Sequence, residues 1–290
     1  MSEALWARNL GIMAARNKPE AQELESEITA WLIGRGVIVR DEVAMLRDGT
    51  AGLDMLVVLG GDGLMMRTAR IFPDIPLLGI NFGHVGFLTM VERRNWQAAL
   101  EATITGRCRV QRGPTLTATL LRRGEVVAQG WVINDVVLRS GPQMVEIELY
   151  IDGQFVNIYP GDGMIVSTPQ GSTAYCMSAG GPILSRGVRG CVIVALNAHS
   201  PIHIPLVVDE ESEIDLVTVN DKPCWLYLDG NIINAPQLQR GDVVQVRRGE
   251  YTFATILLSG MNFYEAVRGR FNFLIRPEAI PTRSVKHQDD

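Results

Sequence analysis

The sequence predicts a protein of two domains, an α/β domain followed by a β-rich domain. Its 290 residues exceed the roughly 100–200 residues of an ordinary domain. Strand and helix signals alternate over the first hundred residues or so, and from residue 109 onward strand signals follow one another. We place the domains at residues 1–107 and 108–262, with a return segment and a loose tail at 263–290.

The first domain is expected to contain a parallel sheet with helices on its faces. Met55–Leu59 is a run of apolar residues, the pattern of a strand buried on both faces. Apolar residues at helical spacing from Ala21 to Leu32 indicate a helix that ends near Gly34. Alternation of such signals is typical of parallel strands joined by helices. In order, strands are expected at 10–14, 37–40, 55–59 and 77–80, and helices at 18–34, 64–71 and 95–105.

The second domain is expected to consist almost entirely of strands. Residues 146–151 alternate polar and apolar side chains at first, the pattern of a strand with one wet face. Asp152-Gly153 then predicts a hairpin turn. In order, strands are expected at 116–122, 125–128, 131–138, 146–151, 154–158, 164–166, 191–195, 214–219, 224–228, 243–247 and 251–257, with one helix at 173–179.

Composition excludes several classes of protein. The hydrophobic fraction is 47% and the charged fraction 20%, which excludes disorder for the bulk of the chain. The net charge of −5 argues against nucleic acid as the main partner. No apolar run approaches the ~20 residues that span a bilayer, and no secretory signal is readable. We therefore expect a soluble, cytoplasmic protein without a membrane partner.

The cysteine and histidine patterns predict no metal site. The chain has four cysteines, none in a C-x-x-C pair, so neither a zinc site nor a redox motif is visible. Without an export signal we expect reduced, buried thiols. His199 and His203 are four residues apart, but Pro201 lies between them and no acidic residue follows in metalloprotease register.

A glycine-rich turn, Gly60-Gly61-Asp62-Gly63, separates the predicted strand 55–59 from the predicted helix 64–71. Glycines at the carboxyl end of a parallel strand let the backbone approach a phosphate, and the helix start adds free N–H groups. The sequence contains no G-x-x-x-x-G-K-[ST], so a P-loop is excluded. Asp62 is then a general base for an attacking hydroxyl, a metal ligand, or only the N-cap of the helix.

A second polar segment covers residues 159–183, where a predicted strand enters a loop rich in glycine, serine and threonine. Hydroxyl groups come from Ser167, Thr168, Ser172 and Thr173, and Tyr175 offers a flat face. Such a turn can bind a nucleotide base and sugar. From composition alone, a strand followed by a capped helix explains most of the segment.

These residues resemble the NAD kinase family as an ordered set. Gly60–Gly63 resembles the family's phosphate-loop motif, and residues 79–88 resemble its following G-I-N-x-G-x-L-G-F-L stretch. Asn134-Asp135 stands where the family has Asn-Glu. Residues 162–182 resemble its longest and most specific signature, D-G-x-x-x-S-T-P-T-G-S-T-A-Y. Asp229-Gly230, residues 262–264 and Arg268 resemble later parts, so the resemblance covers roughly residues 8–275.

The resemblance implies a fold and a reaction. The family pairs a Rossmann-like α/β N-terminal domain with a β-rich, β-sandwich-like C-terminal domain. It transfers a phosphoryl group from ATP, or in some members polyphosphate, to the adenosine-ribose 2′-hydroxyl of NAD. The resemblance also implies Mg²⁺ or another divalent cation, with no dedicated protein cage readable, and a homo-oligomer, either a dimer or a tetramer.

The resemblance also implies roles for particular residues. Asp62 would be the general base for the 2′-hydroxyl, Phe87 would pack near the adenine, and Asn134 and Asp135 would hold ribose hydroxyls. The donor phosphates would lie on Gly60, Gly61 and Gly63. The residues implied in NAD binding are Asp62, Gly63, Phe87, Asn134, Asp135, Asp162, Thr173, Ala174, Tyr175 and Ser178. His84, in the 79–88 stretch, is either near the phosphates or only packed in its loop.

The sequence departs from the family pattern at four positions. Leu64 replaces a threonine after the glycine turn, which bears on the choice between ATP and polyphosphate. Asp135 replaces a glutamate and is one methylene shorter, and Gln170 replaces a threonine. Pro160 replaces a basic residue, and members that accept NADH tend to lack that charge, so we expect NADH to be accepted. Two other functions remain open: a non-catalytic NAD(P)-binding sensor, and a related kinase acting on a lipid.

Overall fold

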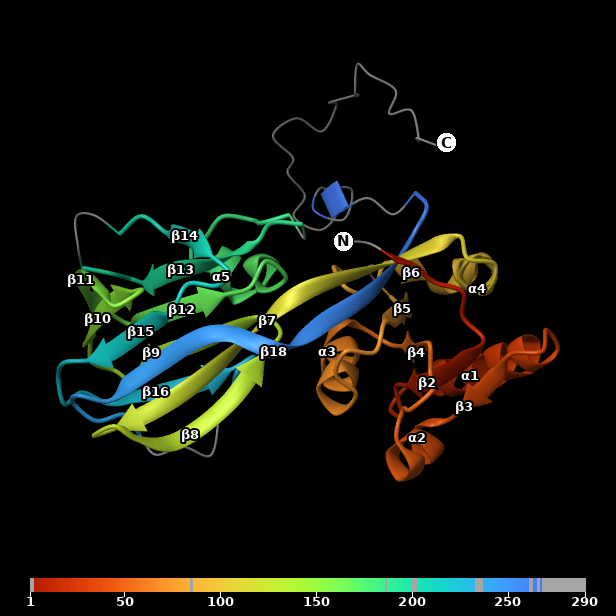
Figure 1. Ribbon diagram of the computed structural model, residues 1–290, viewed down its shortest axis with the longest axis horizontal. Helices are drawn as coiled ribbons and strands as arrows, with labels where there is room; N and C mark the ends of the chain where they lie inside the picture. Colours follow the sequence, from red (N-terminus) through yellow and green to blue (C-terminus); the bar gives the residue numbers. More distant parts are fainter. Residues whose placement is uncertain are drawn as a thin grey trace, which may run out of the picture. The chain divides into compact units, whose positions relative to one another are not determined.

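The computed structural model describes residues 3–83, 86–185, 187–199, 203–232, 237–260, 263–264 and 267, and it forms two compact units (Figure 1). Unit 1 comprises Met1–Arg112 and resumes at Ala254, and unit 2 comprises Gly113–Phe253. The strands β7 (Cys108–Arg122) and β18 (Val243–Leu258) contribute residues to both units. The predicted fold class, an α/β domain followed by a β-rich domain, is confirmed.

Unit 1 is built on a parallel sheet with the strand order β5-β4-β2-β3. These strands are β2 (Asn9–Ala14), β3 (Ile38–Arg40), β4 (Met55–Leu59) and β5 (Leu77–Asn81). Short strands lie beside it: β6 (Val91–Glu92) pairs with β5, and β1 (Glu3–Ala4) pairs with β7. The helices are α1 (Pro19–Ile33), α2 (Glu42–Asp48), α3 (Asp62–Ile71) and α4 (Trp96–Ile104), the last preceded by the 3₁₀ turn Arg93–Asn95.

Burial explains why these segments adopt these elements. All five residues of β4 are buried, as the continuous apolar run predicts. The buried residues of α1 are Ala21, Leu24, Ile28 and Leu32, which lie three or four positions apart on one face. The sequence analysis missed α2, a short helix whose N-cap Asp41 accepts a hydrogen bond from the Ala44 N–H at 2.7 Å.

Unit 2 consists of two antiparallel sheets that share one apolar core. One sheet has the strand order β14-β13-β12-β9-β16-β17, and the other contains β11, β10, β15 and β18 together with β7 and β8. Buried residues of both sheets form a common cluster, including Leu120 and Val244 from one sheet and Leu138 and Ile193 from the other. This is the predicted β-sandwich-like arrangement.

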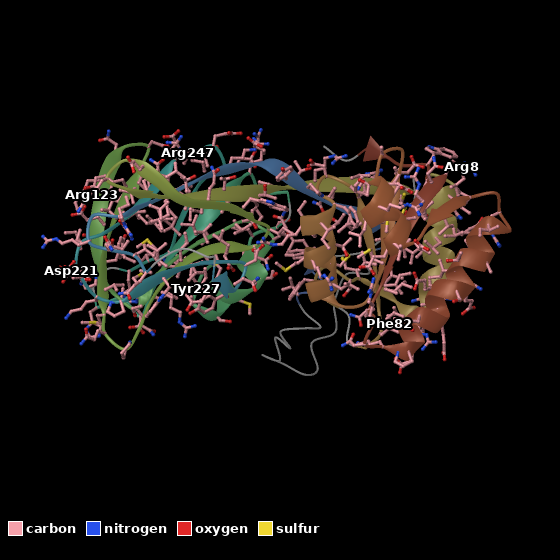
Figure 2. All side chains as sticks on the ribbon, turned by 90° about the horizontal axis from the view of Figure 1, so that it is seen from below. Arg8, Phe82, Arg123, Asp221, Tyr227 and Arg247 are labelled. Atoms are coloured by element: carbon pink, nitrogen blue, oxygen red, sulfur yellow. The ribbon has the colours of Figure 1, made fainter. Side chains whose placement is uncertain are left out.

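The remaining strands have the following bounds: β8 (Glu125–Val132), β9 (Asp135–Ser140), β10 (Val145–Ile151), β11 (Gln154–Gly161), β12 (Gly163–Ser167), β13 (Gly190–Leu196), β14 (Leu206–Asp209), β15 (Ile214–Thr218), β16 (Cys224–Leu228) and β17 (Asn231–Ile232). The only helices described in unit 2 are the 3₁₀ turn Gly171–Thr173 and α5 (Tyr175–Ser178). Charged residues such as Arg123, Asp221 and Arg247 are exposed (Figure 2).

Several predicted boundaries in unit 2 were wrong. The predicted strand 131–138 is interrupted at Ile133 and Asn134, and the predicted pair 243–247 and 251–257 is the single strand β18. The edge strand β14 was missed, and the predicted helix 173–179 is shorter. All four cysteines are buried and unpaired, as expected. Within the described ranges, no helix is both long enough and apolar enough to cross a membrane.

Candidate functional site

The glycine turn lies at the carboxyl end of β4, where α3 begins. The N-cap of α3 is Gly61 and the helix starts at Asp62, so the interpretation of Asp62 as the N-cap is wrong. A Cβ atom added at Gly61 or Gly63 would meet nothing within 4 Å, whereas one at Gly60 would lie 2.8 Å from Cδ2 of Leu64. The turn therefore leaves open space at two glycines next to a helix N-terminus, the arrangement that binds phosphate.

The Asp62 carboxylate binds a loop that follows β5. Its Oδ2 accepts a hydrogen bond from the Phe87 N–H at 2.9 Å. Its Oδ1 accepts from the N–H groups of Leu88 at 3.2 Å and Thr89 at 3.0 Å, and from the Thr89 hydroxyl at 2.9 Å. These contacts fix the orientation of the carboxylate, and they bring together two predicted site residues, Asp62 and Phe87.

Thr89 connects Asp62 to the end of β5. The Asn81 amide donates to the Thr89 Oγ1 at 3.0 Å, and the Asn81 Oδ1 accepts from the Gly83 N–H at 2.6 Å. A Cβ atom at Gly86 would overlap Oδ1 of Asp62, so only glycine leaves room for the carboxylate there. The sequence analysis assigned no role to Asn81 or Thr89, although both lie in or beside the motif at residues 79–88.

A cavity of about 380 Å³ opens in front of this carboxylate. Asp62, Gly61 and Gly63 line it from the turn, Asn81 lines it from the end of β5, and Lys18 lines it from the start of α1. It lies wholly within unit 1. The Lys18 ammonium supplies positive charge, and the two glycines supply unobstructed backbone, so the cavity suits an anionic phosphate group.

In unit 2, Asn134 and Asp135 lie at a bend held by Asp229. The Asp229 carboxylate accepts from the N–H groups of Ile133 at 2.9 Å, Asn134 at 2.7 Å and Asp135 at 3.2 Å. These contacts span more than ninety residues of sequence and explain why the predicted strand 131–138 is interrupted. The bend presents Asn134 as a partly buried side chain beside Asp135.

The hydroxyl-rich segment packs directly against that bend. The Thr168 N–H donates to the Asn134 carbonyl at 2.9 Å, and the Thr168 hydroxyl donates to the Ile133 carbonyl at 2.6 Å. Ser167 and Ser172 are also buried, and their hydroxyls bond backbone groups. All four hydroxyls considered for ligand binding therefore donate to backbone carbonyls, the Thr173 hydroxyl to that of Gln170 at 3.1 Å. The side chains of Thr173, Tyr175 and Ser178 remain partly or fully exposed.

Asp135 is a buried carboxyl group in this cluster. Its side chain is only 4% exposed, and burial, with the nearby charge of Asp229, raises the pKa of Asp135 to about 7. Burial also raises the pKa of the neighbouring Cys176 thiol to about 11, which makes that thiol unreactive.

Two other predicted residues, Asp162 and Pro160, lie at the opposite end of β12. Asp135 pairs with Ser167 at one end of the strand, and Asp162 precedes Gly163 at the other end, so roughly 16 Å of strand separates them. There the Asn197 amide donates to the Asp162 carboxylate at 2.8 Å, and the His199 N–H donates to the Pro160 carbonyl at 2.8 Å. The predicted dinucleotide pocket thus divides into two groups of residues within unit 2.

A protein-built metal cage is not evident in the part of the chain that the structure describes, which contains no group of three or more potential ligands among His, Cys, Asp and Glu. Three residues considered from the sequence, His84, Asn262 and Arg268, lie outside the described residues. The described sites are thus a phosphate-type cavity in unit 1 and a polar, hydroxyl-bearing cluster in unit 2.

An α/β unit with a glycine-rich turn at a helix N-terminus, followed by a β-sandwich-like unit with a polar cluster, is the arrangement expected of a two-domain phosphotransferase. Residues 20–108 match the family model of the ATP-NAD kinase N-terminal domain, and residues 133–258 match that of the C-terminal domain. The chain belongs to the NAD kinase family. The predicted enzyme class is confirmed, and the matches give no support to the lipid kinase or the sensor.

Named relatives agree with the family models. The chain is 51% identical to the NAD kinase of Thermomicrobium roseum, with 98% of each chain covered. It is 32% identical to that of Geobacter metallireducens, covering 92% of this chain and 99% of the relative. Among solved structures, yeast NADH kinase complexed with NADH has a TM-score of 0.81 at 21% identity, over 97% of this chain and 90% of that one. An Archaeoglobus fulgidus NAD kinase in complex with ATP has a TM-score of 0.69 at 20% identity, over 91% and 98%.

Proposed function

We propose that this chain transfers the terminal phosphoryl group of ATP or polyphosphate to the adenosine-ribose 2′-hydroxyl of NAD, and that Asp62 is the general base. The observation that carries this proposal is the Asp62 carboxylate, which is fixed in orientation at the rim of a cavity built from the glycine turn. An alcohol is a weak nucleophile, so a carboxylate within reach of its proton is the help that the reaction needs.

The reaction balances with the groups described. The ribose oxygen forms a bond to the terminal phosphorus, the bond from that phosphorus to the bridging oxygen breaks, and the remaining donor phosphate leaves with the electron pair. The hydroxyl proton passes to the Asp62 carboxylate. Gly61, Gly63 and Lys18 bind the donor phosphates in the cavity, where the backbone and the ammonium group offset negative charge.

The polar cluster of unit 2 supplies the proposed contacts to NAD. Asn134 and Asp135 hold ribose hydroxyls, and the exposed residues at 173–178 contact the rest of the nucleoside. Phe87, whose N–H donates to Asp62, packs near the adenine. Asp162 lies at the other end of β12 and therefore contacts a different part of the dinucleotide from Asn134.

A divalent cation fits this site only as a companion of the donor. Asp62 is the one carboxylate among the described residues that line the donor cavity, with the Asn81 amide beside it. Mg²⁺ commonly binds through one or two carboxylates and the substrate phosphates. When bound, it would neutralise charge on the donor oxygens.

Three further features belong to the proposal. Pro160 places no positive charge at its position, so NADH is accepted as well as NAD. By family resemblance the chain acts in the cytoplasm and assembles as a dimer or tetramer. The preference between the two acceptors is measured as the ratio of kcat/KM for NAD to that for NADH. A preference above ~100-fold for NAD would contradict the proposed use of NADH.

The proposed base is tested by assaying NADP formation from NAD, Mg²⁺ and either ATP or polyphosphate. We expect Asp62→Asn to lower kcat by ~10²–10⁴. The same substitution also disturbs the loop that the carboxylate holds, so Thr89→Val serves as a matched control. It removes one donor to Oδ1 and keeps the base, and we expect it to lower kcat far less. A wild-type protein that forms no NADP with either donor would contradict the proposed function.

A further inference from the structure

A second cavity, of about 420 Å³, lies beside the glycine turn in unit 1. It runs from the loop after β2 to the first turns of α3, and Arg16, Glu42, Leu64 and Arg67 are among the residues that line it. Gly63 lines both this cavity and the donor cavity, and a Cβ atom there would meet nothing within 4 Å. The two cavities therefore adjoin at a residue that has no side chain.

The charged groups of this second cavity come from three different elements. Arg67 is an exposed residue of α3, and none of the carboxylates that the structure describes forms an ion pair with it. Arg16 donates from Nε at 3.1 Å and from Nη2 at 2.9 Å to one oxygen of Glu42, which fixes the plane of its guanidinium. The Glu42 side chain is 14% exposed and that of Arg16 is 71% exposed, so the guanidinium faces solvent while its partner is covered. Two positively charged side chains, Arg16 and Arg67, and one negatively charged side chain, Glu42, therefore line this cavity.

We propose that this cavity binds the phosphates of the donor that are not transferred, and that Arg67 and Arg16 are the residues that bind them. This inference rests on the proposed function, because it extends the donor site away from Asp62. Guanidinium groups bind phosphate oxygens through paired N–H donors, and a group already held in orientation loses less freedom on binding. The neighbouring Leu64 offers no hydroxyl, so the arginines are the phosphate-binding groups on this side of the turn.

The binding chemistry is that of a condensed phosphate chain, which ATP and inorganic polyphosphate share. The arginine contacts go to phosphate oxygens and not to the base or sugar. A condensed phosphate that extends from the donor cavity past Gly63 therefore gains contacts with Arg67 and Arg16. A single orthophosphate in the donor cavity does not reach these arginines.

The inference is tested by titrating tripolyphosphate into the full chain, without NAD, in a calorimeter. We expect Arg67→Ala to weaken the affinity by about tenfold, since charge-assisted hydrogen bonds are the strong class. Arg16→Ala is expected to weaken it in the same direction, and Arg67→Lys, which keeps the charge, to fall between Arg67→Ala and the wild type. Arg70→Ala is the matched control, because Arg70 is an exposed arginine of the same helix that lines neither cavity.

Steady-state kinetics distinguish the two sources of the phosphate chain. If Arg67→Ala raises KM for both ATP and polyphosphate and leaves KM for NAD unchanged, the cavity binds the phosphate groups of either donor. If KM rises for one donor only, the cavity binds the phosphate groups of that donor. Unchanged tripolyphosphate affinity in Arg67→Ala and Arg16→Ala overturns the inference, even if NADP is formed. A wild-type protein that binds tripolyphosphate but makes no NADP instead overturns the proposed function.

Discussion

At the scale of single residues, the candidate site depends on two carboxylates in different surroundings. Asp62 is partly exposed and bonded to backbone N–H groups and a hydroxyl. Asp135 is buried, and its pKa is raised to about 7 by burial and by the charge of Asp229. The first is held in a fixed orientation by its hydrogen-bond donors, whereas the second is suited to change its protonation near neutral pH.

The raised pKa of Asp135 predicts a particular dependence of stability on pH. An unfolded aspartate titrates near 3.9, so between that pH and about 7 the folded protein binds the additional proton. The free energy of unfolding therefore falls as the pH rises through this window and levels off above it. We expect Asp135→Asn, which does not titrate there, to lose less stability than the wild type between pH 5 and pH 8, by on the order of 2 kcal/mol.

Urea unfolding at several pH values between 5 and 8 measures this difference. Asp221→Asn is the control, because Asp221 is an exposed carboxylate in the same unit and its replacement should leave the pH profile unchanged. If Asp135→Asn had the wild-type pH profile, Asp135 would already be ionised at pH 5 in the folded protein.

At the scale of elements, the sequence predicted most accurately the strands and helices that are marked by a run of neighbouring apolar residues. The strands β4 and β16 were predicted with their observed bounds, because each is a compact run of apolar residues bounded by aspartate at one end and by glycine or proline at the other. The helix α2 was missed because it has seven residues and buries only Met45. The bend at Ile133 and Asn134 was missed because its cause, Asp229, lies more than ninety residues away in sequence.

The candidate site shows the same division between local and distant signals. The glycine turn was recognised because its residues are consecutive and follow a buried strand. The contacts of Asp62 with residues 87–89 span at least 25 positions, and no local pattern indicates them. The buried hydroxyls of Ser167 and Thr168 were considered for ligand binding because composition does not reveal that backbone carbonyls already accept their hydrogen bonds.

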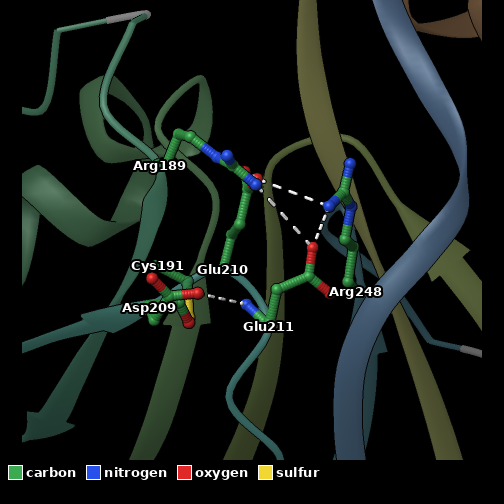
Figure 3. A network of polar contacts seen from close by, with 6 residues as sticks. All are labelled: Arg189, Cys191, Asp209, Glu210, Glu211 and Arg248. Carbon is green, nitrogen blue, oxygen red and sulfur yellow. Dashed lines mark hydrogen bonds and ion pairs between the residues drawn. The ribbon is translucent and has the colours of Figure 1, made fainter.

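An ion-pair network joins the end of β14 to β13 and β18 in unit 2 (Figure 3). The Arg189 Nε lies 2.7 Å from Oε1 of Glu210, and the Arg248 Nη1 lies 3.4 Å from the same oxygen. Arg248 also pairs with Glu211. The two glutamates differ in burial, with side chains 8% exposed for Glu210 and 58% exposed for Glu211. Replacing Glu210 and Glu211 one at a time therefore compares the contribution of a covered ion pair to stability with that of an exposed one.

We expect Glu210→Gln to destabilise unit 2 by ~1–3 kcal/mol, because it leaves Arg189 without its covered charged partner. Glu211→Gln, the matched control, is expected to change stability by less than about 1 kcal/mol, since exposed ion pairs contribute little. Chemical denaturation of the two variants at low salt measures both values. Equal losses for the two substitutions would mean that burial does not govern the strength of this network.

At the scale of the whole molecule, each unit has an apolar core and a set of polar site residues of its own. The core of unit 1 includes Leu10, Leu24 and Met55, and that of unit 2 includes Leu138 and Leu216. The net charge of the chain is −5, yet cations line the two cavities beside the glycine turn. The binding of an anionic phosphate donor therefore depends on the positive charges that line these cavities, and not on the net charge of the whole protein.

The assignment of donor contacts to unit 1 and of NAD contacts to both units predicts two different patterns of amide hydrogen exchange. Tripolyphosphate is expected to protect only the backbone around residues 14–18 and 60–67, because its proposed contacts all lie in unit 1. NAD is expected to protect the turn at 60–63 and also residues 134–135 and 171–178 of unit 2. The exposed hairpin turn at Asp152 and Gly153, which carries no proposed contact, serves as the internal control. Protection by NAD that is confined to one unit would show that the other unit's residues do not bind the dinucleotide, and the roles given to Asn134 and Asp135 or to Asp62 and Phe87 would then have to be withdrawn.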